Sequence, residues 1–298
     1  MKGWNIIEKI GKGSFGTVYK VKRDQPGADG QAVYGALKVL EIPQDEDELR
    51  NIWQEYDNEE SVRTYISDLK EDYLREIEMM ISLRGEPNIV HIEGYEVEPV
   101  GEYGWRISIC MEYLQDFWQY AKAHPMTEKE TIRLALDICD ALICCEERNI
   151  IHRDIKPANL FYSPEGRYKL GDFGVARMEE ALTGTYSVKG TFPYMAPEVF
   201  WAEHYDSTVD IYSLGIVLYR LMNRSRLPFE NIYKPTFTYR EKEEALRRRM
   251  KGEAFQNPVD ASEAFAAVIM RSCAFPSKER YQGAREMKAD LLAIAEEF

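Results

Sequence analysis

The sequence predicts an α+β protein in which strands come first and helices follow. Three observations carry this prediction. Up to about Met111, alternating apolar runs are separated by glycine-containing turns, the pattern of antiparallel strands. From Thr127 onward, apolar residues recur at helical spacing. Hydrophobic residues make up 45% of the 298 residues, which is ample for a sizeable core.

The charge of the chain is acidic and uneven. The formal net charge is −13, and residues 41–72 hold twelve Asp or Glu against three Lys or Arg. Nucleic-acid binding needs clustered Lys and Arg, so we expect no nucleic acid among the partners. No run of about 18 apolar residues follows Met1 or occurs later, so we expect no membrane segment. Five cysteines without a C-x-x-C pair favour a reduced, cytoplasmic protein without zinc.

A glycine-rich turn separates the first two expected strands. Gly11-Lys12-Gly13-Ser14-Phe15-Gly16 follows an alternating run that begins at Ile6, and the alternation resumes from Thr17 to Val21. Glycines let backbone N–H groups approach phosphates, and Phe15 at the tip is placed to close over them. Dinucleotide-binding folds carry the same glycine spacing, but there a helix follows the last glycine. The strand pattern here therefore argues against that fold.

The next expected strand, Tyr34–Leu40, carries one lysine among apolar residues. Lys38 either extends to solvent from a sheet edge or has a functional role such as gripping phosphates. The following helix carries two acidic residues, Glu76 and Glu78, that could face this strand. We prefer Glu76, because the apolar stripe of that helix lies beside it and Glu78 points away.

An acidic insert of about thirty residues, 41–72, lies between Lys38 and that helix. Its second half has apolar residues at helical spacing, which predicts a backward extension of the helix or a second helix packed against it. Its first half, Gln44 to Glu60, is expected to be solvated. Trp53 and Tyr56 are apolar exceptions there, and they form either a small satellite cluster, which we favour, or a surface for a partner.

Four polar residues suited to phosphoryl transfer lie close together in the sequence. Asp154, Lys156 and Asn159 share one short stretch, Ile151–Leu160, and Asp172 follows twelve residues later. A strand-turn-strand arrangement would make them converge. Phosphoryl transfer needs a carboxylate for the hydroxyl proton, a cation for the moving phosphate and oxygen ligands for magnesium. In order, these four residues match those needs.

The whole set of motifs resembles the protein kinases. The glycine-rich turn, the strand lysine, His152-Arg153-Asp154, Asp172-Phe173-Gly174 and Ala196-Pro197-Glu198 occur in the order and at the separations of that family. Lys156 two residues after Asp154, with Gly190-Thr191 ahead of Ala196, resembles Ser/Thr kinases of eukaryotic type, including bacterial ones.

The resemblance implies a two-lobed kinase fold. A small antiparallel β lobe with one main helix would span residues 1–111 and contain the insert at about 41–72. The hinge and a larger, mainly α-helical lobe would span residues 112–298, so that the whole chain is one kinase domain. The family also has a buried acid under the catalytic loop, matched by Asp210, and a structural ion pair, matched by Glu198 and Arg280. The run Arg247-Arg248-Arg249 is expected to be a solvated helix face.

The same resemblance assigns roles in the expected site. Lys38 and Glu76 would orient the ATP phosphates, Asp154 would accept the proton of the acceptor hydroxyl, and Lys156 would stabilise the moving phosphoryl group. Asn159 and Asp172 would hold Mg²⁺. ATP would also contact the glycine-rich turn, Val18, Ala36, the gatekeeper Met111 and the backbone of Glu112 and Leu114. Asp116 is a weaker candidate for the ribose, since helix capping explains it equally well.

Activation by phosphorylation is expected between Asp172 and Glu198. Thr183, Thr185 and Ser187 are the candidate sites, because Arg153 matches the family's cation for a loop phosphate. Thr191 would instead bond Asp154 and Lys156.

Protein substrates are the expected partners, and the insert is a candidate surface for self-association or a regulator. The alternative is a nucleotide-binding pseudokinase or scaffold, which the complete set of Lys38, Asp154 and Asp172 disfavours. A small-molecule kinase is a third possibility, and the Ala196-Pro197-Glu198 segment, which looks built to seat a peptide, argues against it.

Overall fold

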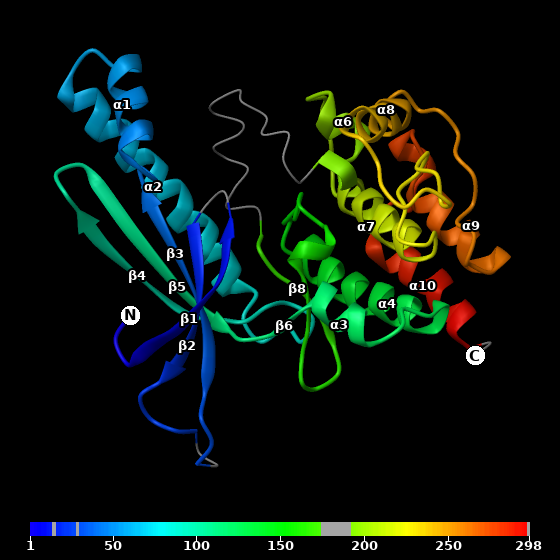
Figure 1. The fold of residues 1–298 in the computed structure, drawn as a ribbon, viewed down its shortest axis with the longest axis horizontal. Coiled ribbons are helices and arrows are strands. Elements are labelled where there is room, and N and C mark those ends of the chain that lie inside the picture. The colour runs from blue at the N-terminus through cyan, green and yellow to red at the C-terminus, as the bar shows by residue number, and fades with distance from the viewer. Residues whose placement is uncertain (14–15, 28–29, 174–191, 297–298) are drawn as a thin grey trace. The chain divides into compact units, whose positions relative to one another are not determined.

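The computed structural model describes residues 1–13, 16–27, 30–173 and 192–296, which form two compact units (Figure 1). The first unit contains the described residues of Met1–Gly85 and Val90–Leu114. The second contains Glu86–Ile89, Gln115–Phe173 and the described residues from 192 onward. Within these described ranges, no helix combines the length and apolar character needed to cross a bilayer.

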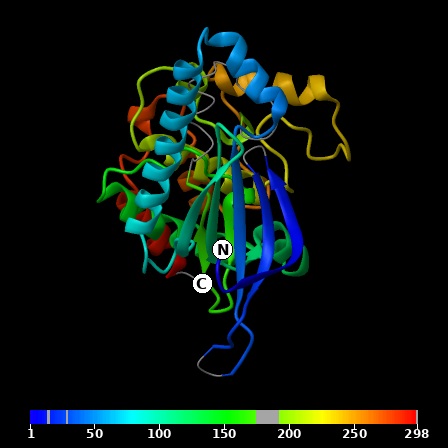
Figure 2. The same ribbon diagram turned by 90° about the vertical axis from the view of Figure 1, so that its left-hand side faces the viewer.

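The first unit is built on a five-stranded sheet in which every neighbouring pair is antiparallel (Figure 2). The spatial order is β1-β2-β3-β5-β4, so β1 and β4 are the edge strands. The predicted small antiparallel sheet is confirmed. Its strands are β1 (Trp4–Gly13), β2 (Gly16–Arg23), β3 (Tyr34–Ile42), β4 (Ile92–Val100) and β5 (Gly104–Glu112).

One face of this sheet carries a small apolar cluster. Val21, Leu37 and Cys110 are almost fully buried, and Trp4 and Tyr19 pack against them. Tyr19, Leu37 and Cys110 lie directly opposite one another on β2, β3 and β5, and residues paired across strands share a face. Because successive side chains alternate between faces, the neighbours of these residues project from the other side of the sheet.

The long helix α2 (Glu59–Ser82) extends backward from the predicted helix into the insert. Asn58 caps it, its side chain accepting a hydrogen bond from the N–H of Ser61 at 2.9 Å. Buried residues recur along it every three or four positions, which explains why one helix forms through the insert. These residues are Val62, Ile66, Leu69, Tyr73, Ile77 and Met80. The expected backward extension is confirmed, and α2 packs against β3 and β4.

The first half of the insert is exposed, as expected, but it also contains a helix that the sequence analysis did not foresee. Helix α1 (Glu46–Glu55) begins at Asp45, whose side chain accepts the N–H of Glu48 at 2.9 Å. Only Ile52 of its ten residues is buried, although Leu49, Ile52 and Trp53 recur at helical spacing. The cap and the three acidic residues of its first turn stabilise it instead, since both complement the positive end of the helix dipole.

Aromatic and cationic side chains hold the insert to the sheet. Trp53 meets Tyr103 edge-on at 5.7 Å between ring centroids, and the Arg63 guanidinium lies 4.5 Å from the same tyrosine ring. Further along α2, the Lys70 ammonium lies 4.3 Å from the ring centroid of Trp105 on β5. Such cation–π contacts contribute roughly 0.5–1 kcal/mol each at exposed sites. They tie the inserted part of α2 to the β4–β5 hairpin.

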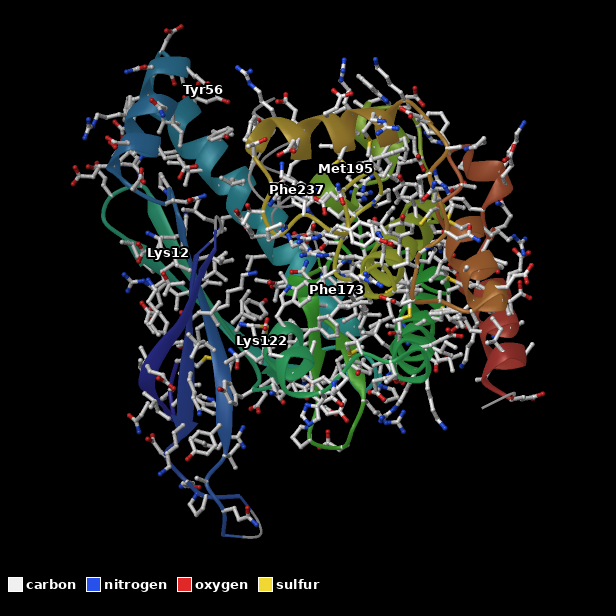
Figure 3. The ribbon with its side chains drawn as sticks, turned by 45° about the vertical axis from the view of Figure 1, so that its right-hand side comes forward. Lys12, Tyr56, Lys122, Phe173, Met195 and Phe237 are labelled. Atoms are coloured by element: carbon white, nitrogen blue, oxygen red, sulfur yellow. The ribbon has the colours of Figure 1, made fainter. Side chains whose placement is uncertain are left out.

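Tyr56, in the connection between α1 and α2, packs on Tyr65 of α2 with 5.1 Å between ring centroids (Figure 3). With the contact between Trp53 and Tyr103, this agrees with the satellite cluster that the sequence analysis favoured. Trp53 nevertheless keeps 38% of its surface exposed.

The second unit is mainly helical, as predicted. Thr127 caps α4 and accepts the N–H of Glu130. Helix α7 is buried along nearly its whole length, and it packs against α4 and α9 while α10 packs against α4. The longer helices are α3 (Phe117–Ala123), α4 (Glu128–Glu146), α7 (Thr208–Leu221), α8 (Tyr239–Met250), α9 (Glu263–Ser272) and α10 (Ala284–Ala295), and α6 is the short helix Pro197–Phe200.

Short elements complete this unit. A small antiparallel sheet has the order β6-β7-β8, with β6 (Gln115–Asp116), β7 (Leu160–Tyr162) and β8 (Tyr168–Leu170). The 3₁₀ helices are η1 (Pro157–Asn159), η2 (Phe192–Tyr194) and η3 (Ser277–Glu279). The antiparallel hairpin of β7 and β8 leads from Asn159 to Asp172 and agrees with the expected strand-turn-strand, while the residues from Ile151 to Asn159 form a loop that ends in η1.

The arginine run on α8 is only partly a solvated face, and the prediction is wrong for its last member. Arg247 is exposed and pairs with Glu244, and Arg248 is partly exposed and pairs with Glu253. Arg249, however, is 4% exposed, and its guanidinium lies 6.0 Å from the ring centroid of Tyr212. Three consecutive helical residues point in directions about 100° apart, so one of them falls on the buried face.

Candidate active site

The predicted ATP-contacting residues of the first unit share one face of the sheet. Val18 lies opposite Lys38, and Ala36 lies opposite Met111. Ala36 and Lys38 are two residues apart on β3, so their side chains project to the same side. This face is the reverse of the one that carries Leu37 and Cys110. The structure therefore brings the strand lysine, the gatekeeper and two apolar contact residues together on one surface.

Gly16 is required where the glycine-rich turn enters β2. Its φ of +140° lies in a region that side-chain-bearing residues rarely adopt, and an added Cβ would lie 2.2 Å from the carbonyl oxygen of Val39. Gly11 is less demanding, since its Cβ would make only an ordinary 3.8 Å contact with Val18. The strands on both sides confirm a β-hairpin rather than a strand-to-helix turn. Ser14 and Phe15 lie outside the described residues.

Lys38 and Glu76 both belong to the first unit, on β3 and on α2, which pack against each other. Glu76 is half-buried, with one carboxylate oxygen out of contact with solvent, whereas Glu78 is exposed. The preference for Glu76 over Glu78 therefore agrees with the orientation of the helix. The pairing of Lys38 with Glu76 stays a prediction.

The expected hinge follows β5. Met111 is 9% exposed, and the backbone N–H of Glu112 donates to the carbonyl of His91 at 3.0 Å. Because this N–H group already donates within the unit, the predicted contact between Glu112 and adenine would use the Glu112 carbonyl oxygen. Asp116 accepts the N–H of Gln119 at 3.1 Å and caps α3, as the capping alternative predicted.

The catalytic loop of the second unit brings three predicted residues into direct contact. The Lys156 ammonium lies 2.8 Å from Asp154 Oδ2, and the Asn159 amide donates to the same oxygen at 2.9 Å and to the Asp154 carbonyl at 2.8 Å. The other oxygen, Oδ1, is buried and accepts no hydrogen bond from the described residues. A buried carboxylate oxygen with acceptor capacity is suited to receive a hydroxyl proton.

Asp210, near the start of α7, holds the backbone of this loop. It is 3% exposed, and its two carboxylate oxygens accept the N–H groups of His152 at 2.7 Å and of Arg153 at 2.8 Å. Arg153 has a φ of +67°, a strained conformation that the surrounding structure must impose. The role expected for Asp210 is confirmed by these contacts.

His152 is a positioning residue that the sequence analysis left without a role. Its side chain is buried, and its Nδ1 accepts the N–H of Asp154 at 3.2 Å. The proton of the neutral ring therefore lies on Nε2, which donates to the carbonyl of Gly171 at 3.1 Å. Its ring also packs on Phe173, with 4.6 Å between centroids (Figure 3). His152 thus joins the catalytic loop to the segment that carries Asp172.

Asn159 and Asp172 fit a divalent cation of the magnesium type. The Gly171 N–H donates to the Asn159 carbonyl at 2.9 Å, which holds the residue before Asp172 against Asn159. The Asn159 NH₂ group is bonded to Asp154, so its side-chain oxygen is oriented away from that carboxylate. No group of three or more His, Cys, Asp or Glu among the described residues could hold a metal by itself. Mg²⁺ suits such a site, because it takes few protein ligands and completes its shell with phosphates and water.

The segment after the activation loop is anchored by an ion pair. Arg280 is 1% exposed, and its guanidinium binds both oxygens of Glu198 at 2.5 and 2.8 Å. The two parallel bonds form a bidentate arrangement and confirm the predicted structural pair. The candidate phosphorylation sites Thr183, Thr185 and Ser187, and also Thr191, lie outside the described residues.

A family model described as "Protein kinase domain" matches residues 4–291. The chain belongs to the protein kinase family. The predicted family and its two-part α+β fold are therefore confirmed.

Curated proteins named serine/threonine-protein kinases also match this chain. PknB of Mycobacterium tuberculosis is 34% identical over 194 residues, which cover 62% of this chain and 30% of that protein. PknB of Mycolicibacterium smegmatis is 33% identical over 195 residues, covering 63% and 30% of the two chains. Serine/threonine-protein kinase 36 of Pongo abelii is 34% identical over 226 residues, covering 74% and 15%. The matches thus span less than a third of the length of these relatives.

Proposed function

We propose that this chain is a serine/threonine protein kinase that transfers the γ-phosphoryl group of ATP to protein hydroxyls. The observation that carries the proposal is the catalytic loop. Asp154 keeps one buried oxygen for a proton, while Lys156 and Asn159 fix the other oxygen at 2.8 and 2.9 Å. Membership of the family and the names of its relatives support the same activity.

In the proposed reaction, the substrate hydroxyl oxygen attacks the γ-phosphorus, and the bond to the ADP oxygen breaks. Asp154 orients the hydroxyl through Oδ1 and receives its proton, while Lys156 neutralises charge on the moving phosphoryl group. Asn159 and Asp172 are the residues that would hold Mg²⁺, which supplies positive charge for the phosphate oxygens when bound. Lys38, held by Glu76, would orient the phosphates, and the carbonyl of Glu112 and the backbone of Leu114 would bind adenine.

Substitution of two residues tests this assignment. Asp154→Asn and Lys38→Met should each lower kcat by on the order of 10²-fold or more, because both groups act on the transition state. Thermal unfolding and nucleotide affinity should show that the variants remain folded. A pseudokinase, the rival function, would bind nucleotide but give no phosphorylated product even as wild type. Near-normal turnover in both variants would refute the proposed roles.

We also propose regulation by phosphorylation of Thr183, Thr185 or Ser187. The support is Arg153, whose side chain is exposed beside the catalytic aspartate and lies 5.5 Å from the ring centroid of Tyr205. A phosphate of nearly two negative charges would form strong hydrogen bonds with that guanidinium. Replacing the three hydroxyl residues by Ala should lower activity. Arg153→Ala should make the phosphorylated and unphosphorylated forms equally active.

The acidic insert is proposed as a surface for self-association or a regulatory partner, since it begins the helix that carries Glu76. Deleting residues 44–60 should change activity or association, and unchanged behaviour in both would make α1 a passive addition. A cytoplasmic location is proposed as well, because all five cysteines are free and buried.

A further inference from the structure

Lys20 of β2 lies between two tyrosine rings in the first unit. Its ammonium nitrogen is 4.5 Å from the ring centroid of Tyr113 and 5.0 Å from that of Tyr34. A tyrosine ring attracts a cation because the face of the ring is negatively charged. No carboxylate of the described residues forms an ion pair with Lys20, so the two rings are the partners of its charge there. We call Lys20, Tyr34 and Tyr113 the lysine clamp.

The strand register places this clamp on the face of the sheet that carries the predicted ATP contacts. Lys20 lies opposite Ala36 on β3, and Ala36 lies opposite Met111 on β5. Residues paired across strands share a face, so Lys20 projects to the same side as these two predicted contacts. Tyr34 comes two residues before Ala36 and projects to that side as well. The clamp therefore forms the end of the nucleotide-facing surface.

The clamp also reaches the expected hinge. Strand β5 ends at Glu112, which pairs with Gly35 of β3, and Tyr113 is the next residue of the chain. Tyr113 stands between Glu112 and Leu114, whose backbone groups are predicted to bind adenine. The Lys20 ammonium thus connects β2, the strand that follows the glycine-rich turn, to the segment expected to bind the base.

Neither burial nor strand pairing fixes Tyr113. The pairing of β3 with β5 ends at Glu112, one residue earlier. The Tyr113 side chain is 37% exposed and that of Tyr34 is 43% exposed, so neither ring is enclosed in the core. The contact with Lys20 orients the Tyr113 side chain and, through it, the backbone of the same residue.

We propose that Lys20 is a positioning residue that holds the hinge backbone at Tyr113 ready for adenine, and so raises the affinity for adenine nucleosides and nucleotides. This inference rests on the proposed ATP-dependent activity and adds a residue outside its motifs. A segment that is already ordered loses less conformational freedom when the ligand binds. One cation–π contact at an exposed site changes an equilibrium by about two- to fivefold.

Two other roles for Lys20 give different expectations. If the ammonium attracted phosphates directly, loss of its charge would weaken the binding of ADP and not of adenosine, which has no phosphate. If the lysine clamp only stabilised the fold, its loss would lower the melting temperature and leave both affinities unchanged. Positioning of the hinge requires adenosine and ADP to weaken by the same factor.

The test measures the binding of adenosine and of Mg-ADP to the full chain by titration calorimetry. Lys20→Met, which removes the charge and keeps the length, should weaken both by about fivefold, and Lys20→Gln replaces it if the Met variant does not fold. Lys20→Arg should stay within about twofold of wild type, because a guanidinium also binds a tyrosine face. In steady-state phosphorylation, Lys20→Met should raise the KM for ATP by the same factor and leave kcat within about twofold.

A double-mutant cycle shows whether the effect passes through Tyr113. Tyr113→Leu should weaken both ligands about as much as Lys20→Met, and the double variant should be no weaker than either single variant. Lys22→Met is the matched control, because Lys22 projects to the same side of β2, is exposed and contacts no aromatic ring of the described residues. It should bind both ligands as the wild type does.

Unchanged adenosine affinity in Lys20→Met overturns the positioning role, whatever happens to ADP. Losses that add in the double variant overturn it too, as does a wild-type protein that does not bind adenosine. A wild-type protein that binds both ligands and phosphorylates no protein overturns the proposed transfer and leaves the role of Lys20 in place. The two failures are therefore distinguishable.

Discussion

Asp210 offers the sharpest test of how the catalytic loop is held. Asp210→Asn leaves one oxygen to accept an N–H but turns the other acceptor into an NH₂ group facing a backbone donor. The two bonds at 2.7 and 2.8 Å are made by a charged acceptor, and each such bond contributes about 1.5–3 kcal/mol. We therefore expect Asp210→Asn to lower the free energy of unfolding by about 2–4 kcal/mol and Asp210→Ala by about 3–5 kcal/mol.

The loss should also appear in catalysis. Without the second acceptor, the strained φ of Arg153 is no longer imposed, and the adjacent Asp154 leaves its position. We expect kcat to fall by about 10²-fold while nucleotide affinity changes little, because misplacing a catalytic group by about 1 Å has that effect. Urea unfolding followed by tryptophan fluorescence gives the stability, and steady-state phosphorylation of a peptide gives kcat.

Asp206 provides a matched control on the same helix end. Its carboxylate accepts the N–H and hydroxyl of Thr208 at 2.9 and 2.6 Å, and it makes no hydrogen bond or ion pair with the described residues of the catalytic loop. Asp206→Asn should lower stability by about 1 kcal/mol and leave kcat unchanged. The Thr208 hydrogen bond lowers the pKa of Asp206, so its contribution is present above the unfolded pKa of about 3.9 and is lost as pH falls through the folded value. Wild-type stability and kcat in Asp210→Asn would refute the reasoning.

Three further outcomes are expected. Gly16→Ala should raise the KM for ATP and lower the melting temperature, because the added Cβ would lie 2.2 Å from the Val39 carbonyl oxygen. Gly94 has open space around it, so Gly94→Ala is the control and should change neither quantity. Glu198→Gln should cost about 3–5 kcal/mol in urea unfolding, since it leaves Arg280 buried beside a neutral partner. The five cysteines should resist a thiol reagent at pH 7.5 until the protein unfolds, because burial raises every thiol pKa, to about 11 for Cys144 and higher for the rest. Rapid labelling of native protein would contradict that expectation.

Local motifs made most of the candidate site predictable. Lys156 and Asn159 contact Asp154 because the three residues share one short loop, and the strand register that unites Val18, Ala36 and Lys38 follows from simple alternation. Asp210 lies 56 residues beyond Asp154, and only the resemblance to a family connected them.

The misses have physical reasons. Helix α1 buries one residue of ten, and its signal lay in the cap Asp45 and in the helical spacing of Leu49, Ile52 and Trp53. Arg249 looked like its two neighbours, and only the packing of α8 shows which of three arginines turns inward. The role of His152 depends on its tautomer. Two groups set that tautomer, the N–H donor of Asp154 two residues later and the carbonyl acceptor of Gly171 nineteen residues later.

The insert forms the start of α2, and this position makes it a site for protein engineering. It lengthens α2 at the end far from Glu76, and about 20 Å of continuous helix, at 1.5 Å per residue, separates Arg63 from that glutamate. A helix is stiff against twisting over such a length. A new binding module fused at the bend between α1 and α2 would therefore transmit its movement along α2 to Glu76. Light-sensitive or small-molecule-sensing domains grafted there would offer a route to switchable enzymes without any change near the phosphate-handling residues.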